Sequence, residues 1–122
     1  MKRHNFKDGD VIFREGDRSN AAYLITSGQV HIVLVRDDGN AKTIAVLNKG
    51  EYFGEMGVID DKPRSATAIA KGPVVCMSVG QEEFTYMLIN RPQESIDLLK
   101  VFFERLRKAN EKLARIEKAE GR

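Results

Sequence analysis

The sequence predicts a mainly β domain that ends in helices, and three observations support this class. First, glycines recur at intervals of roughly 7 to 22 residues over the first two-thirds of the chain, which is the rhythm of turns in a sandwich or barrel. Second, short runs of β-branched and apolar residues fill the spaces between these glycines. Third, the apolar spacing becomes helical after Gly80. The turn glycines are Gly9, Gly16, Gly28, Gly39, Gly50 and Gly72.

The β body is expected to consist of short strands with one irregular insertion. The clearest strands are predicted at residues 11–13, 22–25, 30–35, 43–47 and 74–79. The turn residues from Asp37 to Asn40 predict a hairpin. Residues 51–70 are broken by Gly, Asp and Pro, so we expect a functional loop at this place in a jelly roll.

Two helices are expected after Gly80. The first runs from Gln81 to Ile89 and ends at Arg91-Pro92, because the residue before a proline avoids the helical region. The second begins near Gln93 and carries apolar residues at the a and d spacing of a coiled coil. We expect the later part of this seam to form a homodimer contact, with a monomer as the alternative. The seam consists of Leu99, Phe102, Leu106, Ala109, Leu113 and Ile116.

Composition indicates a small cytoplasmic binding module. The 122 residues suit one domain, with 42% hydrophobic and 31% charged residues. No apolar run approaches the length of a membrane span, and no signal segment opens the chain. The lone Cys76 lies in an apolar run, so we expect a buried thiol and a reducing compartment. The net charge is +2, and the +4 on residues 100–122 is expected to be solvated rather than to bind nucleic acid.

Catalysis is not indicated by any constellation of residues. His4 lies near the chain end and His31 within a strand pattern, without metal-ligand spacing. No nucleophile is followed by a recognisable base. One cysteine cannot supply the ligands of a cysteine-bound iron–sulfur cluster. We therefore expect no enzyme activity, no metal site and no cofactor.

Two segments of the irregular region have the chemistry of a nucleotide site: Phe53 to Val58 and Pro63 to Ala68. Gly54 permits close approach of a ligand, and the following amides can face an anion from the start of a short helix. Arg64 offers a planar guanidinium that can grip two phosphate oxygens. Glu55 only accepts hydrogen bonds, so a ribose hydroxyl is its natural partner. Taken without their context, Arg64 and Glu55 would instead be a surface ion pair.

These two segments resemble the phosphate-binding cassette of cyclic nucleotide-binding domains, the family of the catabolite activator, the protein kinase A regulatory subunit and cyclic-nucleotide-gated channels. The resemblance extends to residues 8–12, 15–17, 23–30 and 84–88 and covers nearly the whole chain. It implies an eight-stranded jelly-roll β-roll over residues 1–80, with the cassette at 53–68. Hinge and lid helices would follow over residues 81–122, within one domain of residues 1–122.

The resemblance also implies roles for individual residues. Glu55 would bind the ribose 2′-OH, Arg64 the cyclic phosphate, and Ser65 would add a hydroxyl or amide. Arg105 or Arg107 on the lid would contact the purine, with solvent exposure as the alternative. Ile32 would line the base pocket, although an ordinary core role is the alternative. The expected ligand-binding residues are Phe53, Gly54, Glu55, Met56, Gly57, Pro63, Arg64, Ser65, Ala66, Ile32, Arg105 and Arg107.

The implied function is a regulatory sensor that prefers cAMP to cGMP and responds by moving its C-terminal helices. In this mechanism Val58 and Ile59 repack against Phe84 when the ligand pulls the cassette inward. Arg64 is expected to be a surface-loop charge, so that Arg64→Ala would abolish binding and leave the fold intact. Two alternatives stay open: a ligand-silent interaction or dimerisation module, and the sensor half of a larger transcription regulator, channel or kinase.

Overall fold

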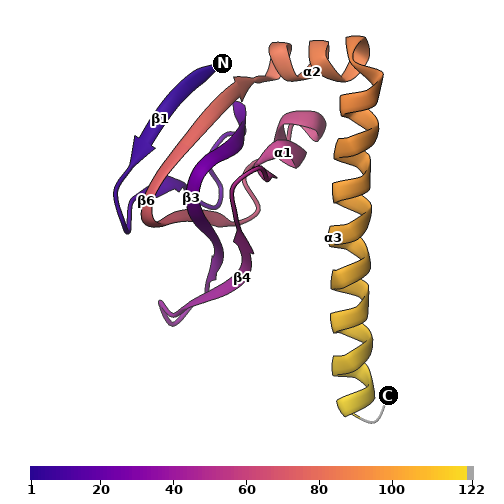
Figure 1. Cartoon of the computed structure of the whole chain (residues 1–122). Helices are drawn as coiled ribbons and strands as arrows, with labels where there is room; N and C mark the ends of the chain where they lie inside the picture. The colour runs from indigo at the N-terminus through magenta and orange to yellow at the C-terminus, as the bar shows by residue number, and fades with distance from the viewer. Residues whose placement is uncertain (121–122) are drawn as a thin grey trace. The chain divides into compact units, whose positions relative to one another are not determined.

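The computed structural model describes residues 1–120, apart from the side chain of Met56. The strands are β1 (Lys2–Phe6), β2 (Val11–Phe13), β3 (Ala21–Val35), β4 (Ala41–Leu47), β5 (Tyr52–Phe53) and β6 (Thr67–Gly80). The helices are α1 (Glu55–Asp60), α2 (Gln81–Asn90) and α3 (Pro92–Ala119) (Figure 1). The chain divides into two compact units, Met1–Thr85 and Tyr86–Arg122.

All strand pairs are antiparallel, and the two long strands, β3 and β6, pair along almost their whole length. Their halves carry different neighbours. One half of the sheet has the order β1-β6-β3-β5, and the other has the order β2-β6-β3-β4. Figure 1 shows β1, β6 and β3 side by side. This arrangement confirms the predicted jelly-roll class.

The number of continuous strands differs from the eight that were predicted. The two four-stranded halves use eight strand segments, but the described residues form only six strands because β3 and β6 each contribute to both halves. β3 crosses the bend through register shifts between Ile25 and Gln29. Gly28 lies at this bend with φ +92°, and a Cβ there would collide with the carbonyl oxygen of Pro73. The predicted strands 22–25 and 30–35 are therefore one bent strand.

The hydrophobic core lies between the two halves of the sheet. One half contributes Ile25, Phe53, Val74 and Cys76 to a single buried cluster, and the other contributes small and branched residues from β3, β4 and β6. Phe53, Phe13 and Tyr23 form an aromatic group at one end, with Phe53 and Tyr23 stacked at 5.2 Å between ring centroids. The predicted burial of Cys76 is confirmed. The remaining members are Val30, Leu47, Ala68 and Ala70.

Several of the predicted bounds of helices, turns and strands are confirmed, and others differ in the structure. The hairpin around Gly39 forms, with the Arg36 amide donating to the Asn40 carbonyl at 2.7 Å. The first helix ends at Asn90, and the second begins at Pro92. The irregular segment is shorter than the predicted 51–70, because β6 already begins at Thr67, where its small residues pair with β2 and β3. β1 and β5 are additional strands.

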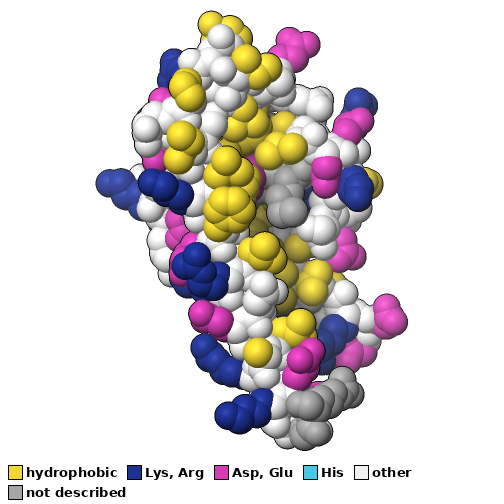
Figure 2. All heavy atoms as spheres, turned by 90° about the vertical axis from the view of Figure 1, so that its right-hand side faces the viewer, with side chains coloured by type: hydrophobic (Ala, Val, Ile, Leu, Met, Phe, Trp, Pro, Cys, Tyr) yellow, Lys and Arg dark blue, Asp and Glu magenta, His cyan; other side chains and the backbone are white. Residues whose placement is uncertain are grey.

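In α3, the exposed apolar face differs from the predicted seam. Phe102 is only partly exposed, whereas the neighbouring Phe103 is 59% exposed. Figure 2, in which α3 faces the viewer, shows hydrophobic side chains gathered along this helix. No helix within residues 1–120 combines the length and apolar character needed to cross a membrane. The large exposed apolar residues of α3 are Ile96, Leu99, Val101, Phe103, Leu106, Leu113 and Ile116.

Candidate functional site

The candidate site is built around the N-terminus of α1 and the loop that joins α1 to β6. Gly54 is the N-cap of α1 and has φ +74°, which an L side chain adopts only with strain. As a glycine, the N-cap residue has no side chain with which to cap this end of the helix. The backbone therefore turns sharply between the buried Phe53 and the buried Glu55.

Arg64, in the loop before β6, reaches back to this turn. Its Nη1 donates to the Gly54 carbonyl and its Nη2 to the Ala21 carbonyl, both at 2.6 Å. The guanidinium carbon lies 4.1 Å from the centre of the Phe13 ring and 5.8 Å from that of Tyr23. One positive group thus joins β3, the start of α1 and the aromatic end of the core.

Arg64 is buried, with only 5% of its surface exposed, so its prediction as a surface-loop charge is wrong. Glu55 is 2% exposed, which also excludes a surface ion pair between the two. Burial lowers the pKa of Arg64, and Tyr23, Asp17 and Glu55 act in the opposite direction. Arg64→Ala will therefore reduce the stability of the fold as well as remove a binding group.

The guanidinium keeps hydrogen-bonding capacity that its protein contacts do not use. It has five N–H donors, and two of them bond to Gly54 and Ala21. The buried Nε has no hydrogen-bond partner among the described residues. Both recorded acceptors are neutral carbonyl oxygens, and the carboxylates of Asp17 and Glu55 compensate only part of the cost of burying the charge. An anion at this place would supply both an acceptor and a charge.

The other cassette residues surround Arg64 in different environments. Gly57 is close to Ser19, and a Cβ on Gly57 would collide with the Ser19 hydroxyl. Pro63 and Ser65 are exposed, whereas Ala66 is buried. Their roles toward a ligand stay predictions. The side chain of Met56 lies outside the described residues.

Three further residues predicted to contact the ligand come from other elements than the cassette. Ile32 in β3 is half-buried and packs against the core cluster, as its alternative role requires. Arg105 and Arg107 belong to the second unit, where Arg107 Nη1 forms an ion pair with Glu104 at 3.1 Å. Contacts of these three residues with a ligand stay predictions.

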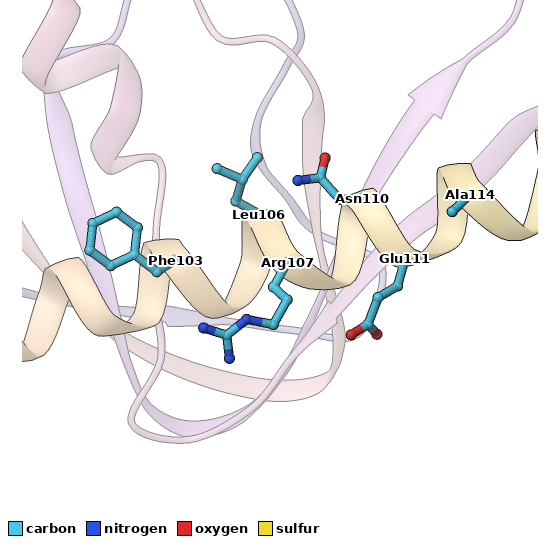
Figure 3. Close-up of a pocket in the computed structure, with 6 residues that line it drawn as sticks. All are labelled: Phe103, Leu106, Arg107, Asn110, Glu111 and Ala114. Atoms are coloured by element: carbon cyan, nitrogen blue, oxygen red, sulfur yellow. The ribbon is translucent and has the colours of Figure 1, made fainter.

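A shallow groove of about 520 Å³ runs along α3 itself and is distinct from the cassette. Figure 3 shows Phe103, Leu106 and Asn110 projecting from one side of the helix, with Arg107 and Glu111 on another. Because only residues of α3 line it, the groove marks an apolar helix face rather than an enclosed ligand pocket.

Sequence reasoning missed the residues that hold the loop of Arg64 in place. Ser19 is 7% exposed, and its hydroxyl donates to the Lys62 carbonyl at 2.7 Å. The backbone of Arg64 bonds to Gly16 and Asp17. The sequence signal that could have identified these residues was the pair of similar turns around Gly9 and Gly16. Within residues 1–120, no three His, Cys, Asp or Glu side chains form a cluster suited to a metal ion.

Comparison with known proteins gives a consistent result. The family model described as the cyclic nucleotide-binding domain matches residues 3–91. The cAMP-dependent protein kinase regulatory subunit of Blastocladiella emersonii is 39% identical over 83 residues, which cover 68% of this chain and 21% of that protein. The Cyclic AMP receptor protein of Thermus thermophilus is 32% identical over 110 residues, or 90% of this chain and 51% of that protein.

Comparison of the structure with solved structures agrees with the sequence comparisons. The crystal structure of the Thermus thermophilus Catabolite Activator Protein matches with a TM-score of 0.84 at 31% identity, covering 95% of this chain and 55% of that one. The chain thus spans about a fifth of the length of the kinase regulatory subunit and about half of the length of the two Thermus thermophilus proteins. With a family model matched from residue 3 to residue 91 and a common fold, the chain belongs to the cyclic nucleotide-binding domain family.

Proposed function

We propose that this chain binds a cyclic nucleotide through its cassette and acts as a regulatory sensor. The observation that carries this proposal is the buried guanidinium of Arg64, whose Nε is unpartnered among the described residues. Burying a cation costs free energy unless a partner compensates it. A cyclic phosphate beside Arg64 would add its negative charge to the influence of Asp17 and Glu55 and would offer an acceptor to the unpartnered donor. Family membership supports the same ligand class.

Phosphate and sugar would be read by different groups of the turn. Arg64 donates to the phosphate oxygens, assisted by the amides of Gly54, Glu55 and Gly57 at the start of α1. Glu55 accepts from the ribose 2′-OH, since a carboxylate has no proton to donate to phosphate. Ser65, which is exposed and follows Arg64 in the chain, would add a hydroxyl. The opposite chemistry of Arg64 and Glu55 therefore favours a ribonucleotide over a simple anion.

We favour cAMP over cGMP as the natural ligand. Two of the relatives reported above are named for cAMP, namely the kinase regulatory subunit and the receptor protein. No catalytic role is proposed, and the ligand is a regulator rather than a cofactor. The buried Cys76 is compatible with a cytoplasmic setting. The lengths of the relatives support an effector region outside these residues.

The output of the sensor would be a shift of the C-terminal helices. α1 is linked to the start of α2, because Gln81 Nε2 donates to the Val58 carbonyl at 3.2 Å. Val58 and Phe84 are both buried, and we expect their surroundings to repack when α1 moves. Ile59 is 53% exposed and contributes less to this end. Switching from 1:99 to 99:1 requires a ligand preference of about 5.5 kcal/mol for one state.

A second copy of the chain is the partner we propose for α3. Leu99, Leu106 and Leu113 repeat every seven residues, and each is about half exposed or more. An apolar stripe of this period is suited to pair with a like stripe in a two-stranded coiled coil. A ligand-silent dimerisation module would use the same face, and the binding experiment below distinguishes it from a sensor.

The test is calorimetric titration of the chain with cAMP, cGMP and 5′-AMP in parallel. We expect binding of a cyclic nucleotide and little or none of 5′-AMP. Arg64→Lys keeps the charge but loses the planar fork, so it should weaken cyclic nucleotide binding at least tenfold. Arg36→Ala, in the hairpin distant along the chain, is the control and should bind as the wild type does. Absence of heat with every nucleotide would favour the dimerisation module.

The sugar assignment has its own experiment. Glu55→Gln should weaken cAMP binding but leave the affinity for 2′-deoxy-cAMP nearly unchanged. The two ligands differ only in the 2′-OH, which is the group that Glu55 is proposed to bind. Equal losses for the two ligands would exclude the role of Glu55 at the 2′-OH. Circular dichroism of the variant checks that the buried position tolerates the amide.

A further inference from the structure

Two turns in the first unit share one design. Lys7 to Asp10 and Arg14 to Asp17 each read base, acid, glycine, aspartate, and the two begin seven residues apart. In each, the aspartate carboxylate accepts from the amide of the first residue, at 2.8 Å in Lys7–Asp10 and 2.9 Å in Arg14–Asp17. The aspartate amide donates back to the carbonyl of that first residue at 3.0 Å in both. The aspartate side chain thus closes its own turn.

Each turn holds one distant residue by two backbone hydrogen bonds. In the first turn, the Gly9 amide donates to the Ala70 carbonyl at 2.8 Å, and the Ala70 amide donates to the Asp10 carbonyl at 2.9 Å. In the second, the Gly16 amide donates to the Arg64 carbonyl, and the Arg64 amide donates to the Asp17 carbonyl, both at 2.8 Å. The same device therefore holds a core strand residue in one case and Arg64 in the other.

The second turn lies next to further anchors of the Arg64 loop. Ser19 follows it and bonds the Lys62 carbonyl at 2.7 Å. The Glu15 amide donates to the Thr67 hydroxyl at 3.1 Å. Residues 14–19 thus hold the chain before, at and after Arg64. A guanidinium at the end of a flexible side chain gains precision when its own backbone is fixed on both sides.

We infer that the turn from Arg14 to Asp17, together with Ser19, positions Arg64 for the phosphate, so that Asp17 and Ser19 are positioning residues for the ligand. This inference rests on the proposed function. Neither side chain is assigned a contact with the nucleotide. When the carboxylate of Asp17 is removed, the turn loses its closing bond, and the backbone of Arg64 becomes free to shift away from the phosphate.

The experiment compares Asp17→Ala with Asp10→Ala by titration with the cyclic nucleotide that the wild type binds. The two variants remove the same carboxylate from matched turns, and thermal melts measure the loss of stability in each. We expect Asp17→Ala to weaken binding about tenfold, which corresponds to 1.4 kcal/mol, and Asp10→Ala to change it less than about twofold. Asp17→Asn keeps an acceptor oxygen and should recover most of the affinity.

The outcomes separate this inference from the proposed function. If the wild type binds no cyclic nucleotide, the proposed function fails. If it binds and Asp17→Ala binds equally well, or Asp10→Ala weakens binding as much, the positioning role is refuted. Failure of Asp17→Asn to recover affinity also refutes it. Should Asp17→Ala not fold, Ser19→Ala provides the test, with an expected loss of about threefold to tenfold from the missing bond to Lys62; unchanged binding of a folded Ser19→Ala overturns the inference.

Discussion

Replacing Gly54 with alanine tests the central geometry of the site. Gly54 has φ +74°, and a Cβ built there would lie 2.5 Å from Nη1 of Arg64 and 3.2 Å from Cε2 of Phe13. Nη1 is the atom that donates to the Gly54 carbonyl at 2.6 Å. Since Phe13 and the backbone leave little room, the guanidinium must move and lose this bond. Gly50 is the matched control, because it has φ +88° and nothing within 4 Å of its Cβ.

Both variants strain the backbone, but only Gly54→Ala also loses a hydrogen bond. The left-handed backbone costs an L-residue about 1–2 kcal/mol, offset by about 0.4–1 kcal/mol from the stiffer unfolded chain. Gly50→Ala should therefore lower the free energy of unfolding by up to about 1.5 kcal/mol. Gly54→Ala additionally loses a hydrogen bond to a charged group, worth about 1.5–3 kcal/mol. The difference between the variants should be about 1.5–3 kcal/mol.

Urea denaturation followed by circular dichroism measures the stability of both variants, and calorimetry measures their affinity for the cyclic nucleotide. We expect Gly54→Ala to weaken binding strongly, since its methyl group occupies the place of the guanidinium. Gly50→Ala should bind as the wild type does. Equal stability of the two variants, together with unimpaired binding by Gly54→Ala, would refute the packing of Arg64 against Gly54.

Three further predictions concern the core and the helices. Burial raises the pKa of the Cys76 thiol to about 11, from an ordinary value near 9. The fold thus favours the neutral thiol, so the free energy of unfolding should fall by about 2 kcal/mol between pH 9 and 11 and change little on this account below pH 9. A Cys76→Ala chain that loses just as much stability over this range would disprove the assignment. Phe84→Ala should cost about 3–5 kcal/mol in urea denaturation, while Tyr86→Ala, 66% exposed, should cost far less. Leu106→Glu should convert a dimer into a monomer, as measured by sedimentation velocity, whereas the control Val35→Glu should leave the dimer intact. A dimer that survives Leu106→Glu would exclude the apolar face of α3 as the dimer contact.

Local signals in the sequence predicted much of the fold. The hairpin at Gly39 and the helix break before Pro92 depend on the backbone preferences of a few adjacent residues, so they were placed within a residue or two. The family motif from Gly54 to Arg64 could likewise be recognised in one short segment. The continuity of β3 through Gly28 could not be predicted from a local segment, because it depends on how closely Pro73 approaches from β6.

By itself, the sequence determined a β body followed by two helices, because periodicity and turn chemistry are short-range properties. The resemblance of two short segments to a known family added the jelly-roll class and the roles of the candidate residues Glu55 and Arg64. The tertiary structure decided the environment of those residues. The partners of the guanidinium, Ala21 and Gly54, lie 43 and 10 residues away from Arg64 in the chain. The exposure of Phe103 on α3 is likewise read from the structure and not from the heptad spacing. Burial and pairing arise between segments that are distant in sequence, and no local pattern records them.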